Sequence, residues 1–327
     1  MSILELAGTN LTSPPVLFFL LGISAAILRS DLAIPQAVAK SLALYLMLAI
    51  GFKGGAAIAE QGVSTVLLTT MLLATFLASL VPFMAYLILR AVTKLNGIEA
   101  ASVAGHYGSI SVVTFVAATQ ALDQAGLRYE GFMVAAAAMM ETPAIVVALL
   151  LARRHVSTDR ETKESLGELM REVLFNGSIV ILLGAFVIGI ISGKSGLDEA
   201  RGFLVDPFKG VLMLFLLDMG LVAGRSLGRA GRDISFAVIA FGVLMPVVSA
   251  SVAVLLGSLT PLSVGGLALL LTLTGSASYI AVPAAMRIAL PEANPAISLT
   301  LSLGVTFPFN LTVGIPIYIA ASRYMVG

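Results

Sequence analysis

Apolar segments separated by short polar ones fill most of this 327-residue chain. The apolar segments approach the ~20 residues that an α-helix needs to cross a bilayer. The pattern therefore predicts an all-α membrane protein with ten transmembrane helices. The predicted helices cover residues 14–30, 35–59, 63–91, 98–121, 130–152, 174–192, 203–226, 233–258, 262–289 and 295–321.

One connection, from Arg153 to Glu172, has the composition of a hydrophilic segment. Its charges are mixed, its composition favours a helix, and it has no apolar stripe wide enough for a core. It would serve either as a solvated connector or as a docking site for a regulator. Mixed-charge helices are usually solvated faces, so we favour the connector and divide the chain at residues 153–173.

Four short motifs recur in the two halves at nearly constant spacing. The matched positions are Gly108 and Gly275, Leu46 and Leu212, Pro82 and Pro246, and Pro143 and Pro308, at offsets of 167, 166, 164 and 165 residues. This regularity predicts that residues 1–152 and 174–327 are two copies of one five-helix unit. Because five is odd, the second copy must enter the membrane from the opposite side, which makes an inverted repeat.

Lys and Arg residues are unevenly distributed among the predicted loops. Thirteen of the nineteen lie in the odd-numbered loops, five lie in the termini and even-numbered loops, and Lys53 lies inside a helix. Cytoplasmic loops of membrane proteins carry an excess of positive charge. We therefore expect a multi-pass protein of the cell (inner or plasma) membrane, with both termini outside and the 153–173 connector in the cytoplasm.

Composition limits the chemistry that is open to the chain. Charged residues make up 11% of it and its net charge is +1, which excludes an ordinary soluble enzyme and gives no attraction to nucleic acid. The chain has no Cys and only two His. A disulfide framework, a thiolate site and a multi-His transition-metal site are therefore excluded.

Two polar, glycine-rich stretches interrupt predicted helices four and nine, at residues 105–111 and 273–279. Backbone at membrane depth is non-helical only where protein or a water-filled cavity satisfies its polar groups. A helix that starts at such a break presents free N–H groups and a partial positive end. Inverted symmetry would bring two such ends together near the midplane and create an anion site without a full cationic side chain.

Four serines in these stretches, Ser109, Ser111, Ser276 and Ser278, would add hydroxyl donors to that site. In the alternative interpretation, glycine and serine only let membrane helices pack closely. A single stretch would favour close packing, whereas two stretches at symmetric positions favour a binding site.

Glu141 lies inside predicted helix five, near Pro143, where an acidic side chain is costly and therefore a functional candidate. Its counterpart in the second copy, Thr306 to Asn310, also places oxygen ligands beside a proline. Carboxylate, hydroxyl, amide and freed backbone carbonyl oxygens are hard donors that suit an alkali cation. Alternatively, Glu141 is protonated and bonded to a helix backbone.

Three further polar residues lie within predicted helices. Lys53 and Asp218 occupy nearly equivalent places in the two copies, but their depths put them near opposite faces of the membrane. There each would snorkel to its interface or line a vestibule. His106 would either hydrogen-bond the backbone of the broken helix or sense pH, and we favour the hydrogen bond.

The motifs resemble those of the cyanobacterial sodium-dependent bicarbonate transporter family. The matching stretches are Gly-Ser-x-Ser at 108–111, Met-Glu-Thr-Pro-Ala-Ile at 140–145, Gly-Ser-Ala-Ser-Tyr-Ile-Ala-Val-Pro-Ala-Ala-Met-Arg at 275–287, Pro-Glu-Ala-Asn-Pro at 291–295 and Thr-Phe-Pro-Phe-Asn at 306–310. The resemblance implies sodium-driven bicarbonate uptake and a homotrimer. It also implies a gate domain of helices one, two, six and seven, a moving core, and control by a small soluble PII-like protein.

The resemblance also implies roles for residues at the matching positions. The implied anion contacts are Gly108, Ser109, Ile110, Ser111, Gly275, Ser276, Ala277 and Ser278. The implied sodium ligands are Glu141, Thr306, Asn310, Ser109 and Ser276, with sodium as the coupling ion and no other cofactor. At the position of Glu141 the family pattern has Asp, so this chain keeps the carboxylate. At the position of Lys53 the family pattern has Ser, so this chain differs in charge near the outer gate.

The leading hypothesis is a secondary active transporter that imports bicarbonate or a similar small anion with sodium, by alternating access of the core against the gate. The alternatives are a sodium- or proton-coupled carrier of a small organic acid on the same fold, and a passive channel. An intramembrane enzyme is disfavoured. A membrane aspartyl protease needs a Gly-x-Gly-Asp motif and a second acid at the same depth, and Asp218 has neither. A metalloprotease needs His-Glu-x-x-His, which is absent. Membrane lipid is the remaining expected partner.

Overall fold

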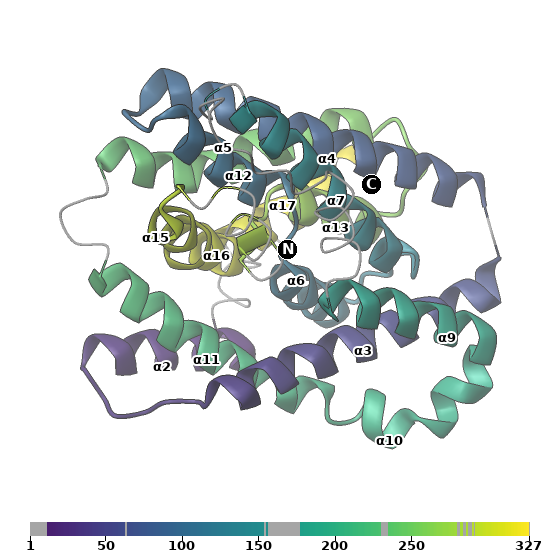
Figure 1. Cartoon of the computed structure of the whole chain (residues 1–327). Helices are drawn as coiled ribbons and strands as arrows, with labels where there is room; N and C mark the ends of the chain where they lie inside the picture. Colours follow the sequence, from purple (N-terminus) through teal and green to yellow (C-terminus); the bar gives the residue numbers. More distant parts are fainter. Residues whose placement is uncertain are drawn as a thin grey trace.

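The computed structural model describes residues 12–62, 64–153, 155, 177–229, 235–279, 282–283, 286, 290 and 292–326. Over these residues every regular element is a helix (Figure 1). The first half contains α2 (Pro14–Ile27), α3 (Gln36–Gln61), α4 (Thr65–Val92), α5 (Gly97–Gly108), α6 (Val112–Gln124) and α7 (Met133–Arg153). The second half contains α9 (Gly177–Glu199), α10 (Arg201–Leu204), α11 (Phe208–Arg229), α12 (Phe236–Gly257), α13 (Val264–Thr274), α15 (Pro295–Leu299), η2 (Thr300–Thr306), α16 (Phe307–Phe309), η3 (Asn310–Gly314) and α17 (Ile315–Val326).

The helices have the lengths and composition of membrane spans. Eight described segments are long and apolar enough to cross a bilayer, and α2 and α13 are shorter apolar helices. The described chain is thus all-helical, with the segments of a multi-pass membrane protein. Most of the second part of predicted helix nine, and the 153–173 connector apart from Arg153 and His155, lie outside the described residues. The ten-helix count and the division at the connector therefore stay predictions.

Two helices differ from their predicted bounds. The sequence predicts a single helix over 203–226, but the structure has α10 followed by a separate α11 that begins at Phe208. Pro207 lies between them, directly before the first residue of α11, a position where its missing N–H costs the helix no hydrogen bond. The α9 helix extends beyond its predicted end at residue 192, through a kink at Gly193 where φ is +59°, a value that glycine adopts without strain.

Several helices begin at side chains that satisfy their free N–H groups. Asn96 and Glu99 form a capping box at the start of α5. Ser263 caps α13, and the Glu130 carboxylate from the α6–α7 connection accepts hydrogen bonds from both the Ser263 N–H (2.7 Å) and its hydroxyl (3.0 Å). Such caps fix where a helix starts.

Two pairs of helices form one side of the molecule. The α2 helix packs along α11 and α3 packs along α9, and these four run across the lower part of Figure 1. Above them, α4 packs against α5 and α7, while α12 and α17 pack against α13. We call α2, α3, α9 and α11 the paired helices and the remaining helices, apart from the short α10, the bundle.

Glycines allow the paired helices to approach closely. A methyl group on any of four glycines would overlap a backbone carbonyl oxygen of the partner helix. These contacts are Gly22 with Leu217, Gly220 with Phe19, Gly55 with Phe186, and Gly189 with Phe52. Small residues at helix crossings are the usual basis of tight packing between membrane helices.

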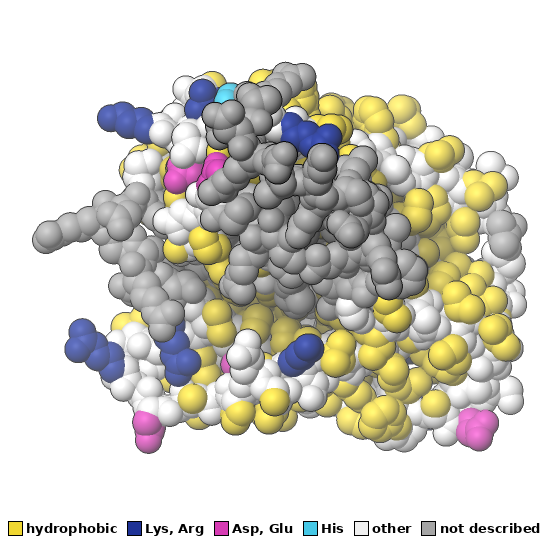
Figure 2. Space-filling model, viewed as in Figure 1, with side chains coloured by type: hydrophobic (Ala, Val, Ile, Leu, Met, Phe, Trp, Pro, Cys, Tyr) yellow, Lys and Arg dark blue, Asp and Glu magenta, His cyan; other side chains and the backbone are white. Residues whose placement is uncertain are grey.

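The outer surface carries apolar side chains where a membrane would contact it. Leu72 and Phe76 on α4, and Val187 and Ile191 on α9, are each more than half exposed. Figure 2 shows hydrophobic side chains over much of the right-hand side of the view, where α4 and α9 lie, and charged side chains mainly near the edges. This distribution suits a protein surrounded by lipid.

Candidate functional site

The first polar stretch breaks a helix inside the bundle. The α5 helix ends at Gly108 and α6 begins at Val112, and between them Ser109 and Ser111 have extended backbone (φ −86°, ψ 165° and φ −101°, ψ 108°). Ser109 and Ser111 are at most 3% exposed. The break predicted in helix four is therefore present, and it lies in the interior.

The second polar stretch also ends a helix. The α13 helix stops at Thr274, Gly275 follows it, and Ser276, Ala277 and Ser278 are non-helical and buried. Residues 280 and 281 are outside the described part of the chain. The predicted interruption of helix nine is therefore present on its α13 side.

The two breaks are hydrogen-bonded directly to each other. The Ser278 N–H donates to the His106 carbonyl oxygen (2.7 Å), and His106 Nδ1 lies 2.7 Å from the Ser278 carbonyl oxygen. A carbonyl oxygen only accepts, so Nδ1 carries the hydrogen. The Ser111 N–H donates to Ser276 Oγ (2.9 Å). The predicted bond from His106 to a broken-helix backbone is confirmed, and the two motifs meet in space.

The serine hydroxyls of the breaks are used in different ways. The Ser111 hydroxyl accepts from the Thr114 N–H (3.1 Å) and so caps α6 while its own hydrogen stays available. The Ser276 hydroxyl donates to the Leu273 carbonyl (2.8 Å), which occupies its hydrogen. Ser109 Oγ has no hydrogen-bond partner among the described residues. Ser109 and Ser111 are therefore able to donate to a ligand in this conformation, whereas the hydrogen of Ser276 is used within the protein.

Both breaks depend on glycine for close packing. A side chain on Gly108 would overlap the ring of Pro82 on α4. A side chain on Gly275 would collide with the Tyr318 hydroxyl and approach the Pro246 carbonyl on α12. The sequence repeat matches Gly108 with Gly275 and Pro82 with Pro246, so each break rests on the matching proline of its own half.

Asn310 holds the second break from the last helix. Its Nδ2 donates to the Gly275 carbonyl (2.8 Å), and its Oδ1 accepts from the Tyr318 hydroxyl (2.8 Å). Asn310 lies where α16, which contains Pro308, is flanked by the π-helical turns η2 and η3. Proline removes one backbone donor, and π-turns of this kind are frequent at functional sites.

Thr306 is bonded to the first broken helix. The Tyr107 hydroxyl on α5 lies 2.6 Å from Thr306 Oγ1, which in turn donates to the Gly242 carbonyl on α12 (2.6 Å). Tyr107 must therefore be the donor in the first contact. Both predicted sodium ligands of the last helix, Thr306 and Asn310, thus lie beside the breaks and already bond to protein groups.

Glu141 is buried on α7, the helix that packs against α4 and α5. Its Oε2 has no hydrogen-bond partner in the described part of the chain, and no described hydrogen bond links it to either break. A buried carboxylate oxygen without a partner is rare in native proteins and calls for a ligand, a proton or water. The predicted sodium role of Glu141 is neither supported nor contradicted by a direct contact.

Lys53 and Asp218 lie apart. Lys53 Nζ is 5.2 Å from the ring centroid of Phe208, and its charged neighbour is Asp123. The charged neighbour of the buried Asp218 is Arg225 on the same helix. Among the described residues Lys53 and Asp218 form no ion pair, in agreement with the depth argument.

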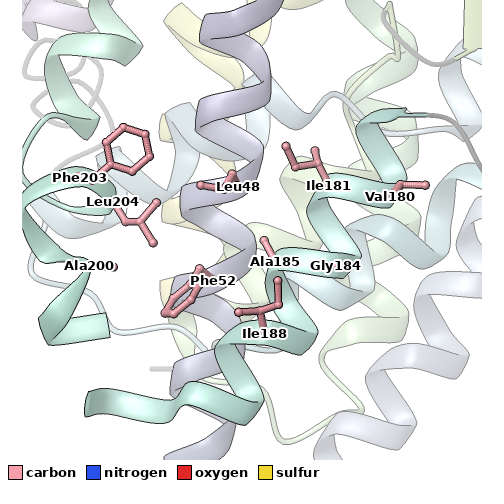
Figure 3. A pocket seen from close by; sticks show the side chains of 10 residues that line it. All are labelled: Leu48, Phe52, Val180, Ile181, Gly184, Ala185, Ile188, Ala200, Phe203 and Leu204. Atoms are coloured by element: carbon pink, nitrogen blue, oxygen red, sulfur yellow. The ribbon is translucent and has the colours of Figure 1, made fainter. Parts of the chain in front are cut away.

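An apolar groove on the outside of the paired helices is separate from the breaks. Figure 3 shows it between α3, α9 and α10, where Phe52, Ile188 and Phe203 are among the side chains that line it. Its lining is entirely apolar, so it offers no side-chain donor to an anion. The groove is therefore not a candidate for the anion site.

Comparison with known families decides the broader identity. A family model of the Na⁺-dependent bicarbonate transporter superfamily matches residues 14–323. The chain belongs to this superfamily. The resemblance inferred from the motifs is thereby confirmed, and the chain is a membrane transporter of a sodium-dependent class. A search of curated proteins finds no match.

In this transporter, sequence reasoning missed three tyrosines around the breaks. Tyr107 and Tyr318 bond to the predicted sodium ligands, and Tyr279 continues the second break. The available signal was the placement of a phenol hydroxyl inside an apolar helix, where a buried hydroxyl needs a partner. The contacts themselves join residues that are far apart in sequence, so no local pattern could reveal them.

Proposed function

We propose that the transporter couples sodium entry to the import of bicarbonate or a similar small anion by alternating access. The observation that carries the proposal is the direct crossing of two helix breaks, with buried polar atoms at the first break that have no partner among the described residues. These atoms include Ser109 Oγ and Thr114 Oγ1. A polar cargo would satisfy such atoms and recover the cost of burying them.

The anion is expected at the start of α6. The first N–H groups of a helix have no intrahelical acceptor, and the aligned peptide dipoles give this end a partial positive charge. The Ser111 hydroxyl takes up one of these groups, the Thr114 N–H, and the N–H groups of Val112 and Val113 would serve the anion. With Ser109 beside them, they form a neutral set of donors that suits a small oxyanion.

Sodium would bind close to the anion. Hard oxygen donors are available from Glu141, Thr306 and Asn310, with Ser109 and Ser276 at the breaks. A bound cation would favour the anion electrostatically in an interior of low dielectric constant. Binding of the two ions would thereby be coupled. Superfamily membership supports sodium as the cation.

Alternating access would use the paired helices as the gate and the bundle as the moving core. The glycine contacts support an internal duplication behind this division. Gly22 and Gly189 are 167 residues apart, as are Phe19 and Phe186. The residues that they contact are 165 apart, namely Leu217 and Phe52 in one case and Gly220 and Gly55 in the other. Each of these two glycine contacts between α2 and α11 thus has a counterpart between α9 and α3. Broken helices at the interface of inverted repeats are typical of secondary transporters.

The loop charges support the proposed orientation with both termini outside. A homotrimer and a PII-like regulator rest on the family resemblance alone. The regulator would contact the cytoplasmic side, where the 153–173 connector is expected. Proteolytic mapping of the connector in spheroplasts would test this orientation, since cleavage from outside would contradict it.

Uptake of labelled bicarbonate into proteoliposomes, with and without an inward sodium gradient, tests the proposed function. We expect uptake that requires the gradient. Folded protein that transports a small carboxylate and ignores bicarbonate would establish the organic-acid alternative. Uptake driven equally well by a proton gradient without sodium would contradict sodium coupling.

A further inference from the structure

Tyr279 is the residue of the second break whose polar atom is left without a partner. The side chain is 8% exposed, and its hydroxyl has no hydrogen bond among the described residues. It directly follows Ser278, which bonds to His106 on the first break. Ser111, on the first break, is its polar side-chain neighbour. The hydroxyl is therefore buried at the crossing of the breaks and has its hydrogen available.

Tyr107 provides an internal comparison. It is also buried on a break, but its hydroxyl donates to Thr306 at 2.6 Å and its ring packs edge-on against Phe241. The phenol of Tyr107 thus belongs to the scaffold. Burying a hydroxyl without a partner is costly, so the Tyr279 hydroxyl, which has no acceptor in the described part of the chain, is suited to donate to a ligand.

The sequence repeat makes Tyr279 a point of asymmetry. At the offset of 167 residues that matches Gly108 with Gly275, Tyr279 corresponds to Val112. One half of the site therefore ends in an apolar side chain and the other in a donor. A pseudosymmetric site needs such a difference to hold an unsymmetrical oxyanion in one orientation.

The ring of Tyr279 is held in place by a column of aromatic side chains. It packs edge-on against Phe307 (5.6 Å between centroids), and Phe307 packs edge-on against Phe19 on α2 (5.1 Å). Phe307 is 1% exposed and Phe19 is fully buried. These contacts fix the ring between the break and the paired helices, so the hydroxyl is positioned before a ligand arrives.

We propose that the Tyr279 hydroxyl donates a hydrogen bond to the transported oxyanion and sets its orientation and specificity. This inference rests on the proposed function. A neutral phenol donor recognises an anion without adding a cation that would compete with sodium. Tyr279 is thereby a specificity-determining residue that adds to the serines and backbone groups of the breaks.

The test compares Tyr279→Phe and Tyr107→Phe with the wild type in the reconstituted full-length chain. Bicarbonate uptake is measured against bicarbonate at saturating sodium and against sodium at saturating bicarbonate, and Tm is measured in detergent. We expect Tyr279→Phe to raise the KM for bicarbonate roughly 10- to 100-fold, as loss of a hydrogen bond to a charged acceptor does. Its Tm and sodium half-saturation should stay at wild-type values. Tyr107→Phe should lower the Tm, because Thr306 loses its donor.

Three results would overturn the inference. They are an unchanged KM for bicarbonate in Tyr279→Phe, a change in sodium half-saturation alone, and a fall in Tm as large as that of Tyr107→Phe. The last would mean that the protein itself uses the hydroxyl. Failure of the proposed function is distinguishable, because the wild type would then show no sodium-driven bicarbonate uptake.

Discussion

His106 and Ser278 exchange two hydrogen bonds across the crossing of the broken helices. The Ser278 N–H donates to the His106 carbonyl, and the His106 ring donates to the Ser278 carbonyl, both at 2.7 Å. The two residues are 172 positions apart. Backbone that leaves helical geometry in the membrane interior must find partners elsewhere, and here each break supplies them to the other.

His106→Leu should destabilise the transporter, because the Ser278 carbonyl loses its donor inside the protein. The expected cost is about 1–3 kcal/mol, seen as a lower Tm in detergent. His106→Asn is the matched control, since its amide nitrogen lies near the position of Nδ1 and can still donate. A His106→Leu protein as stable as the wild type would contradict a structural role for the ring.

Ser109 and Ser276 should respond differently to removal of their hydroxyls. The Ser109 hydroxyl has no partner, so Ser109→Ala should keep the wild-type Tm while bicarbonate uptake falls. The Ser276 hydroxyl accepts from Ser111 and donates to Leu273, so Ser276→Ala should also lower stability by about 1–3 kcal/mol. Uptake kinetics and thermal unfolding of both variants check this. Wild-type uptake kinetics in both variants would refute the assignment of the anion site.

Gly189 and Gly184 lie five residues apart on α9 and give a matched pair for the packing of the paired helices. A methyl group at Gly189 would overlap the Phe52 carbonyl on α3, whereas one at Gly184 would meet no atom within 4 Å. Gly189→Ala should destabilise the protein by about 1–3 kcal/mol through overpacking. Gly184→Ala should be neutral or slightly stabilising. Equal Tm values for the two variants would show that α3 and α9 do not pack closely at Gly189.

The helices and their breaks could be predicted from local sequence, because each depends on nearby residues. Apolar runs determine the spans, and glycine and serine at 108–111 and 275–278 mark the places where helix is lost. Pro207 also marks the start of α11, although the apolar run around it predicted one continuous helix. There the local effect of the proline outweighed the hydrophobic pattern.

The partners of the site residues could not be predicted in the same way. The sequence predicts Thr306 and Asn310 as oxygen donors, and the structure bonds them to Tyr107, Gly242, Gly275 and Tyr318. Those contacts depend on how α5, α12 and the last helix pack, which sequence periodicity does not specify. The motif identified the residues near the site, whereas packing determined which of their polar atoms remain available.

Glu141 offers the sharpest test of sodium coupling. Glu141→Gln keeps the size and polarity of the side chain but removes the carboxylate charge that would attract sodium. We expect this variant to lose sodium stimulation of bicarbonate uptake, with a rise in sodium half-saturation of tenfold or more, while the folded yield is maintained.

Glu141→Asp is the matched control, because it keeps the charge and should retain sodium dependence. Sodium titration of uptake in proteoliposomes measures both. Because a hydrogen bond from protonated Glu141 would survive in Gln, wild-type sodium dependence of Glu141→Gln would favour the protonated alternative and remove Glu141 from the sodium site.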